Sequence, residues 1–300
     1  MSVITSVCML GFGEVGSLLA VQLAERNPDL TLTAIDIAFT DSESPAAAYY
    51  AGQRRVSKTR CPPVDCTLVI SAVTAEQSLA AATAMTELPA GCWFLDINSV
   101  APATKRATAA VIEAIGGRYV EAALMSPIQP KGIHSPILLG GHWAQTFLPL
   151  TRQLGFENVT FCSAELGRAA ATKMCRSVVI KGMEALLMES LLAAHHYGVE
   201  TEVLASLSNL LPETDWTEKA HYMIFRSLAH GARRAEEMRE VAKTVADADI
   251  EPLMSRACAE RQQWAAAYKE SQIAADLVTL LADIRNRLST DSNSNARKSV

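Results

Sequence analysis

A glycine-rich turn near the start of the chain constrains the fold more than any other feature. Residues 11–16 read Gly-Phe-Gly-Glu-Val-Gly, follow the apolar run Ile4–Leu10 and open an expected helix over Val15–Glu25. The chain then returns to a second apolar run that reaches Asp36, 20 residues after Gly16. A strand, a tight turn with three glycines, a helix and a second strand ending in an acidic residue are typical of a dinucleotide-binding α/β sheet.

Each part of this turn has an expected role. Gly11 permits the tight turn, Gly13 lets the backbone approach a pyrophosphate, and Gly16 lets the helix pack closely on the strand. Asp36 is expected to accept hydrogen bonds from the adenosine ribose, and its charge repels a 2′-phosphate, which favours NAD over NADP. Arginines at 54–55 could approach through a loop, so NADP stays possible. A ligand-free glycine turn is the alternative. The residues expected to bind the cofactor are Gly11, Phe12, Gly13, Glu14, Val15, Gly16, Asp36, Val73, Thr74 and Asn98.

Up to residue 163, short apolar runs alternate with helical patterns. Several of the runs are apolar on both faces, as strands inside a parallel sheet are. The sequence therefore predicts a doubly wound Rossmann-type sheet over residues 1–163. The expected strands are Ile4–Leu10, Leu30–Ile37, Thr67–Val73, Trp93–Ile97, Tyr119–Leu124, Ile137–Leu139 and Val159–Cys162, and the expected helices are Val15–Glu25, Ala75–Glu87, Pro102–Ile115 and Trp143–Leu154.

The pattern changes at residue 164. Residues 164–288 contain no convincing strand and are predicted to form an all-α substrate and dimerisation domain. Its first helix is expected over Glu165–Tyr197, with Gly198 as the C-cap. The polar residues 289–300 are predicted to form a disordered tail. The predicted fold class is thus α/β, with an all-α domain after the dinucleotide domain.

Composition excludes several classes of protein. The chain has 300 residues, is 49% hydrophobic and 20% charged, and carries a net charge of −5. These values exclude disorder over most of the length, and without a basic run a nucleic-acid partner is not expected. No stretch has the length and apolar character of a membrane span. Seven scattered cysteines and no cluster with metal-ligand spacing argue against disulfides and a metal site, and they favour a reducing cytoplasm.

A polar stripe marks the long helix that follows residue 164. Lys173, Ser177, Lys181 and Glu184 fall within about 80° of one another on a helical wheel, and most other positions are apolar. Such a stripe suggests a cleft or a water-filled site, where like charges and desolvation lower the pKa of a lysine. The alternative is an exposed stripe with an ion pair between Lys181 and Glu184.

Together these features resemble the β-hydroxyacid dehydrogenase family, which includes relatives of 3-hydroxyisobutyrate and 6-phosphogluconate dehydrogenases. The resemblance runs from about residue 3 to 288. Residues 11–16 match the family pattern G-x-G-x-M-G with Val15 in place of Met. Gly167 is followed six residues later by Lys173, and Ser177 stands where the family has Asn. The resemblance implies that Lys173 is the general acid/base and that position 177 binds substrate.

Two further segments fit the family with departures. Residues 96–99, Asp-Ile-Asn-Ser, occupy the place of the family's hydroxyl-bearing turn near the nicotinamide, and Glu121–Pro127 aligns with its substrate loop D-A-P-V-S-G-G. Met125 replaces the family Ser, Ser126 is adjacent, and both loop glycines are lost, which is typical of a divergent branch. The substrate-binding residues implied are Ser99, Met125, Ser126, Ser177 and Lys181.

The expected function is hydride transfer between NAD, or NADP, and a small hydroxy acid of the β-hydroxyacid or aldonate type. Lys173 would take the hydroxyl proton while the hydride moves to the nicotinamide. One alternative is an imine reductase on the same scaffold, although those enzymes usually lack the lysine. Another is a non-catalytic NAD-binding regulatory protein. The resemblance also implies a homodimer formed through the helical domain.

Overall fold

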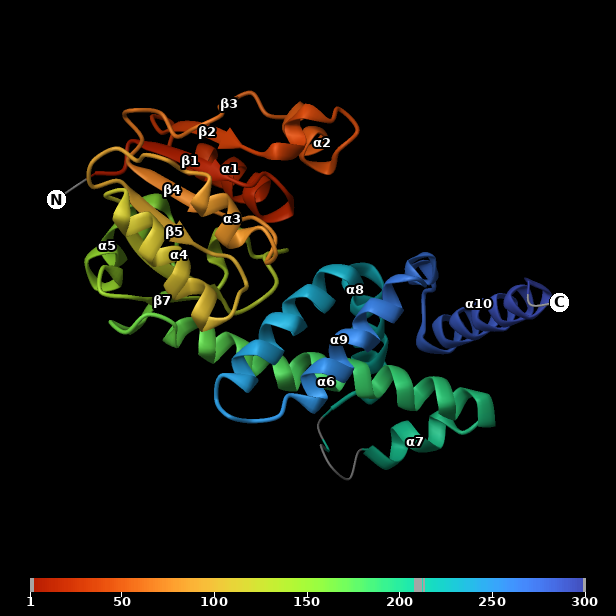
Figure 1. The fold of residues 1–300 in the computed structure, drawn as a ribbon. Coiled ribbons are helices and arrows are strands. Elements are labelled where there is room, and N and C mark those ends of the chain that lie inside the picture. The colour runs from red at the N-terminus through yellow and green to blue at the C-terminus, as the bar shows by residue number, and fades with distance from the viewer. Residues whose placement is uncertain (1–2, 208–211, 213, 299–300) are drawn as a thin grey trace. The chain divides into compact units, whose positions relative to one another are not determined.

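The computed structural model describes residues 3–207, 212 and 214–298 (Figure 1). The chain divides into two compact units, residues 1–175 and residues 176–300. This division lies inside the long helix α6 (Arg168–Tyr197), whereas residue 163, where the sequence predicts the boundary, ends strand β8.

The first unit, in its described residues, contains an eight-stranded sheet in the order β3-β2-β1-β4-β5-β6-β7-β8. All neighbouring strands are parallel except β6 and β7. A mostly parallel sheet followed by helices confirms the predicted fold class. The strands are β1 (Ser6–Leu10), β2 (Thr31–Ile35), β3 (Val56–Lys58), β4 (Leu68–Ser71), β5 (Trp93–Asp96), β6 (Arg118–Leu124), β7 (Ile137–Gly140) and β8 (Val159–Ser163).

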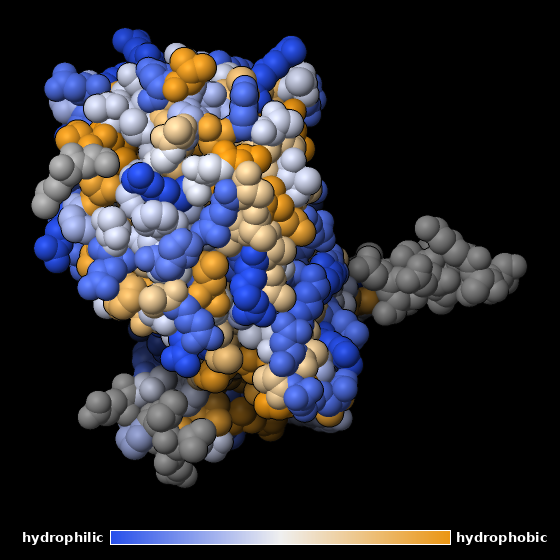
Figure 2. All heavy atoms as spheres, turned by 60° about the vertical axis from the view of Figure 1, so that its left-hand side comes forward, coloured by the Kyte–Doolittle hydropathy of each residue, from blue (hydrophilic) through white to orange (hydrophobic). Residues whose placement is uncertain are grey.

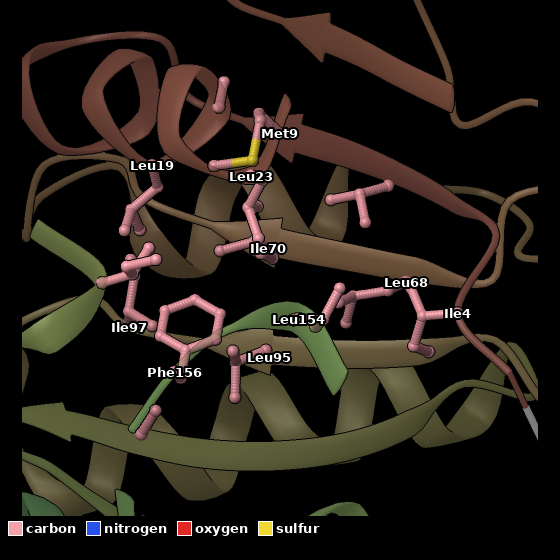
Figure 3. Close-up of a cluster of buried hydrophobic side chains, with 14 of the residues drawn as sticks. Ile4, Met9, Leu19, Leu23, Leu68, Ile70, Leu95, Ile97, Leu154 and Phe156 are labelled. Atoms are coloured by element: carbon pink, nitrogen blue, oxygen red, sulfur yellow. The ribbon is translucent and has the colours of Figure 1, made fainter. Parts of the chain in front are cut away.

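Helices cover both faces of this sheet. Alternate residues of β1 point to opposite sides: Met9 packs with residues of α1 and α5 (Figure 3), and Cys8 packs with residues of α3 and α4. The sheet is therefore the middle layer of three. The helices of this unit are α1 (Glu14–Arg26), α2 (Pro45–Ala51), α3 (Ser78–Thr83), α4 (Pro102–Ala114) and α5 (Ala144–Leu154), with short 3₁₀ turns η1 (Ile37–Thr40) and η2 (Gly132–His134).

Three local features differ from the sequence prediction. Strand β3 and helix α2 were not predicted, because three and seven residues are too short to show a clear period. Helix α3 ends at Thr83, although the pattern predicts a helix to Glu87. The following residues Met85 and Leu88 are buried against the sheet, and Pro89 disfavours helical geometry at Leu88.

The described residues of the second unit form helices joined by turns and loops, with no strand. Helix α6 ends before Gly198, whose φ of +68° fits the predicted C-cap. It is followed by α7 (Glu200–Leu207), α8 (Trp216–Ala246), α9 (Leu253–Ala266), the 3₁₀ turn η3 (Lys269–Ile273) and α10 (Leu277–Lys298). Helix α10 continues to Lys298, and the disordered tail expected over residues 289–300 stays a prediction.

Hydrophilic and hydrophobic side chains both occur on the surface. On the face drawn in Figure 2, hydrophilic residues are spread between small hydrophobic areas. Within the part of the chain that the structure describes, no helix combines the length and apolar character needed to cross a bilayer.

A buried ionic group lies beneath the end of β5. The carboxylate of Asp96 is fully buried, contacts the amine of Lys105 at 2.9 Å and accepts a hydrogen bond from the Tyr119 hydroxyl at 2.7 Å. Its other bond comes from the backbone N–H of Asn98 at 3.0 Å, which fixes the turn after the strand. Burial, and then the charge of Asp96, raise the pKa of Tyr119 well above 10, so the phenol stays a donor.

Replacing Lys105 with Met is expected to lower the free energy of unfolding by about 3–5 kcal/mol, because it leaves Asp96 as a buried charge without its cation. The matched control is Arg256→Met, since Arg256 forms an ion pair with Glu251 in which both side chains are exposed, and its loss costs less than about 1 kcal/mol. Urea unfolding followed by circular dichroism measures both variants. Equal losses would contradict a special role for the buried pair.

Two helical glycines are expected to respond oppositely to alanine. A Cβ on Gly182 in α6 meets no atom within 4 Å, so Gly182→Ala should raise stability by about 0.5–1 kcal/mol through helix propensity. A Cβ on Gly231 in α8 would lie 2.4 Å from the backbone oxygen of Gln262 in α9, so Gly231→Ala should cost about 1–3 kcal/mol. Thermal unfolding of the two variants checks the prediction, and a stabilised Gly231→Ala would refute the close packing of α8 on α9.

Candidate functional site

The sequence-predicted cofactor residues gather at one edge of the first unit. The glycine turn follows β1, Asp36 follows β2, and Val73 and Thr74 follow β4. Residues 98–99 follow β5 and residues 125–126 follow β6. Because β1, β2, β4, β5 and β6 are parallel, their carboxyl ends share an edge, and ligands of doubly wound sheets bind there.

The glycine turn has the geometry that its sequence predicts. Gly11 has a φ of +94°, and a Cβ there would lie 2.6 Å from the Ala72 oxygen. A Cβ on Gly16 would lie 2.1 Å from the Gly11 oxygen, so only glycine allows α1 to start this close to β1. A Cβ on Gly13 meets nothing within 4 Å, and Gly13 caps α1 without a side-chain hydrogen bond. The start of α1 therefore presents backbone N–H groups beside open space.

The carboxylate of Asp36 is tied to this turn. It accepts hydrogen bonds from the N–H of Phe12 at 2.7 Å and from the N–H of Ala38 at 2.8 Å, one on each oxygen. The buried ring of Phe12 packs against Phe39 and Tyr50, with centroids 5.7 and 6.0 Å away. Each carboxylate oxygen keeps a second lone pair, so Asp36 retains capacity to accept hydroxyl donors.

The sequence leaves open whether the arginines at 54–55 approach Asp36, and the structure holds Arg55 at the other end of β2. Arg55 donates to the backbone oxygens of Ala24 at 2.8 Å and Leu30 at 3.3 Å, and Leu30 precedes β2, whereas Asp36 follows it. Lys58 lies at the end of β3 opposite Ala34, and its amine sits 4.4 Å from the ring centre of Tyr50.

The side chain of Asn98 is held in place by two serines. Its amide nitrogen donates to the hydroxyls of Ser71 at 2.9 Å and Ser78 at 3.1 Å. Its amide oxygen is buried and has no hydrogen-bond partner among the described residues. A buried acceptor of this kind can receive a donor from a ligand. Val73 is half-buried and Thr74 exposed beside it at the same edge.

The structure brings Lys173 and Ser99 together. The amine of Lys173, on the second turn of α6, donates to the Ser99 hydroxyl. Lys173 is half-buried and belongs to the first unit with Ser99. A lysine amine and a serine hydroxyl in contact can hold and exchange a proton with a bound hydroxyl or carbonyl group.

Sequence reasoning missed the residue that holds the start of α6. Glu121 lies in β6, is fully buried, and accepts hydrogen bonds from the backbone N–H groups of Gly167 at 2.7 Å and Ala170 at 2.5 Å. An acidic residue inside an otherwise apolar strand was the available signal, because a buried carboxylate requires partners. The same signal marks Asp96 in β5.

The segment expected to bind substrate begins inside β6, continues past its end and lacks the family glycines. Met125 and Ser126 are half-buried. The Met125 N–H donates to the Pro136 oxygen at 2.8 Å, and the Ser126 hydroxyl donates to the Pro127 oxygen at 3.0 Å. Both residues are thus at the same edge as the glycine turn.

The rest of the polar stripe is packed inside the second unit, so the alternative of an exposed stripe is wrong. Lys181 is only 7% exposed, its amine lies 2.7 Å from a carboxylate oxygen of Glu237 in α8, and the same amine donates to the Ser177 hydroxyl at 3.4 Å. Glu184 is 2% exposed and pairs with Arg234 of α8. The stripe is therefore neither exposed nor closed by a pair between Lys181 and Glu184.

Burial has a larger effect on the pKa values of Glu184 and Arg234 than the charges around them have. Desolvation raises the pKa of Glu184 despite the nearby Arg234, and desolvation lowers the pKa of Arg234 despite Glu184. Such a pair costs stability to bury and holds two helices in one register. Among the described residues, no three metal-ligating side chains cluster as a metal site.

Comparison with known proteins places the chain among relatives. A family model described as a domain of unknown function (DUF1932) matches residues 194–265. The structure of a conserved hypothetical protein from Sinorhizobium meliloti is 32% identical, covers 94% of this chain and 97% of its own, and has a TM-score of 0.70. A conserved protein of unknown function, described as structurally similar to 3-hydroxyacid dehydrogenases, is 32% identical over 90% of this chain and 100% of its own, with a TM-score of 0.66.

More distant matches are a solved structure, which shares the fold, and a protein matched by sequence. A Mycobacterium tuberculosis 3-hydroxyisobutyrate dehydrogenase with L-serine is 16% identical over 94% of this chain and 99% of its own, with a TM-score of 0.68. An uncharacterised 28.5 kDa protein of Methanothermus fervidus is 27% identical over 190 residues, 62% of this chain and 71% of its own. The resemblance found in the sequence is confirmed, and the chain belongs to a divergent branch of the 3-hydroxyisobutyrate dehydrogenase-like family, to which these conserved proteins of unknown function also belong.

Proposed function

We propose that this protein is an NAD(P)-dependent oxidoreductase that moves a hydride between a nicotinamide and a small hydroxy acid of the β-hydroxyacid or aldonate type. The observation that carries the proposal is the contact between Lys173 and Ser99, next to the edge where the glycine turn lies. Relatives described as 3-hydroxyacid dehydrogenase-like and as 3-hydroxyisobutyrate dehydrogenases support it.

The residues of the first unit fit a dinucleotide. The open space over Gly13 and the uncapped start of α1 suit a pyrophosphate, and Asp36 has lone pairs for ribose hydroxyls. The unpaired oxygen of Asn98 suits the donor of a carboxamide. When bound, the nicotinamide supplies the hydride chemistry.

Asp36 favours NAD over NADP in this proposal, because a carboxylate repels a 2′-phosphate. Arg55 is occupied at the other end of β2 and does not offset this charge. Lys58 ends strand β3, which pairs with β2, so Lys58 is the cation that would contact the 2′-phosphate of NADP.

Lys173 acts as the general acid/base. Its amine takes the proton of the substrate hydroxyl during oxidation and returns a proton to the forming alkoxide during reduction. Ser99 orients the amine through its hydroxyl. Ser126 and the backbone around Met125 offer donors to the substrate carboxylate, and the proposal keeps Ser177 and Lys181 as substrate-binding residues from the family resemblance. Because Lys181 is held by Glu237, its part in binding requires that this pair be shared or broken.

A homodimer formed through the helical domain stays a prediction, as does a cytoplasmic location. Val179 and Leu186 of α6 support the dimer, because these apolar side chains are 60% and 59% exposed and lie seven residues apart on one face. Burial of such an apolar face is what usually stabilises a symmetric interface between helices.

Replacing Lys173 with Ala is expected to lower turnover at least ~100-fold, the usual size of an acid–base contribution. The assay follows the absorbance of the reduced nicotinamide with a panel of 3-hydroxy acids, aldonates and cyclic imines, and Lys269→Ala, at an exposed lysine, is the control. Normal turnover with weaker substrate binding would refute the role of Lys173. Turnover of imines alone would favour an imine reductase, and tight NADH binding without turnover would favour a regulatory protein.

Replacing Gly13 with Ala is expected to weaken NADH binding at least ~10-fold with a small change in melting temperature. The methyl group meets no protein atom within 4 Å, so it occupies the space assigned to the pyrophosphate. Gly52→Ala is the matched control, because its Cβ also meets nothing within 4 Å but lies after α2. Fluorescence titration with NADH and NADPH gives both affinities. Unchanged affinity in Gly13→Ala would contradict the placement of the cofactor.

A further inference from the structure

In the contacts described above, the buried carboxylate of Glu121 is bound by backbone N–H groups alone. Glu121 is 0% exposed, and its two oxygens accept the N–H groups of Gly167 and Ala170, one each. Both groups belong to the start of α6, where the helix dipole adds partial positive charge. Charge-assisted bonds of this kind are shorter and stronger than neutral ones, so they fix the helix start against β6.

The surroundings leave this carboxylate little room. A Cβ on Gly140, in the neighbouring strand β7, would lie 2.6 Å from a carboxylate oxygen of Glu121. On the other side, Gly167 has a φ of +95°, and a Cβ there would lie 3.0 Å from the Cβ of Pro102. Pro102 opens α4, directly after the turn that carries Ser99. The start of α6 is therefore held between Glu121 and that turn.

Lys173 inherits its position from this arrangement. It lies three residues after Ala170, about one helical turn further along α6, and it reaches Ser99 across the turn after β5. A shift of the helix start therefore moves the amine by a similar distance. A misplacement of about 1 Å can cost about 100-fold in rate.

We infer that Glu121 is a positioning residue: by capping α6 it sets where the amine of Lys173 lies against Ser99. The inference rests on the proposed function of Lys173, and one of its two readouts does not need activity.

The first readout is kinetic and uses Glu121→Gln and Gly140→Ala in the full-length chain. Gln keeps the size but turns one acceptor into an NH₂ group that faces an N–H donor, and Ala at 140 pushes the carboxylate without removing its charge. Both are expected to lower kcat by about 10- to 100-fold while the KM for NADH stays unchanged, since the glycine turn is separate. Asp215→Asn is the matched control, because Asp215 caps α8 by accepting from the N–H of Glu218 at 3.0 Å.

The second readout observes Lys173 directly. Reductive methylation with isotope-labelled formaldehyde gives an NMR signal for each lysine, and Lys173→Arg identifies the one from Lys173. That signal is expected to shift in Glu121→Gln and in Gly140→Ala, and to stay in place in Asp215→Asn. If Glu121→Gln fails to fold, Gly140→Ala carries the test.

The two hypotheses fail in different ways. A folded Glu121→Gln with an unmoved Lys173 signal and wild-type kcat would overturn the positioning role. A Lys173 signal that shifts in the two variants, together with a wild-type protein that turns over no substrate of the panel, would support positioning and refute the dehydrogenase.

Discussion

Two buried carboxylates stand side by side at the carboxyl edge of the sheet, and the candidate site depends on how each is compensated. Asp96 and Glu121 occupy paired positions of β5 and β6. Asp96 takes its cation from Lys105 and binds the backbone of the turn that carries Ser99. Glu121 takes its compensation from the first turn of α6, which carries Lys173. Because neither charge can stay buried without partners, each fixes one segment, and these segments meet in the Lys173–Ser99 contact.

The sequence allowed the first unit to be predicted well where the signal is local. The strand, glycine turn and helix over residues 4–25 need only neighbouring residues to specify them, and the geometry at Gly11 and Gly16 follows from sterics. The buried strands could be predicted because an apolar run of four to seven residues stands out. Strand β3 could not, because only Val56 of its three residues is buried.

The polar stripe of α6 shows where such reasoning ends. Helical spacing predicts that Ser177, Lys181 and Glu184 lie on one face of the helix, and the structure shows that all three are buried. Their partners Glu237 and Arg234 lie about fifty residues further on, in another helix, and no periodicity links the two segments. A stripe of polar residues therefore indicates a shared environment and leaves open whether the environment is solvent, a ligand or a second stripe of opposite charge.

Strand β3 also determines where the sheet stops. It is a sheet edge of three residues, Val56–Lys58, and an edge exposes unpaired backbone groups to which another chain could add a strand. The amine of Lys58 rests over the rings of Phe39 and Tyr50, 4.6 and 4.4 Å from their centres. A strand arriving there would find a short template and would have to desolvate a cation that two aromatic rings already hold. This edge therefore resists the growth of the sheet into aggregates, and it does so with the residues that pack behind the glycine turn.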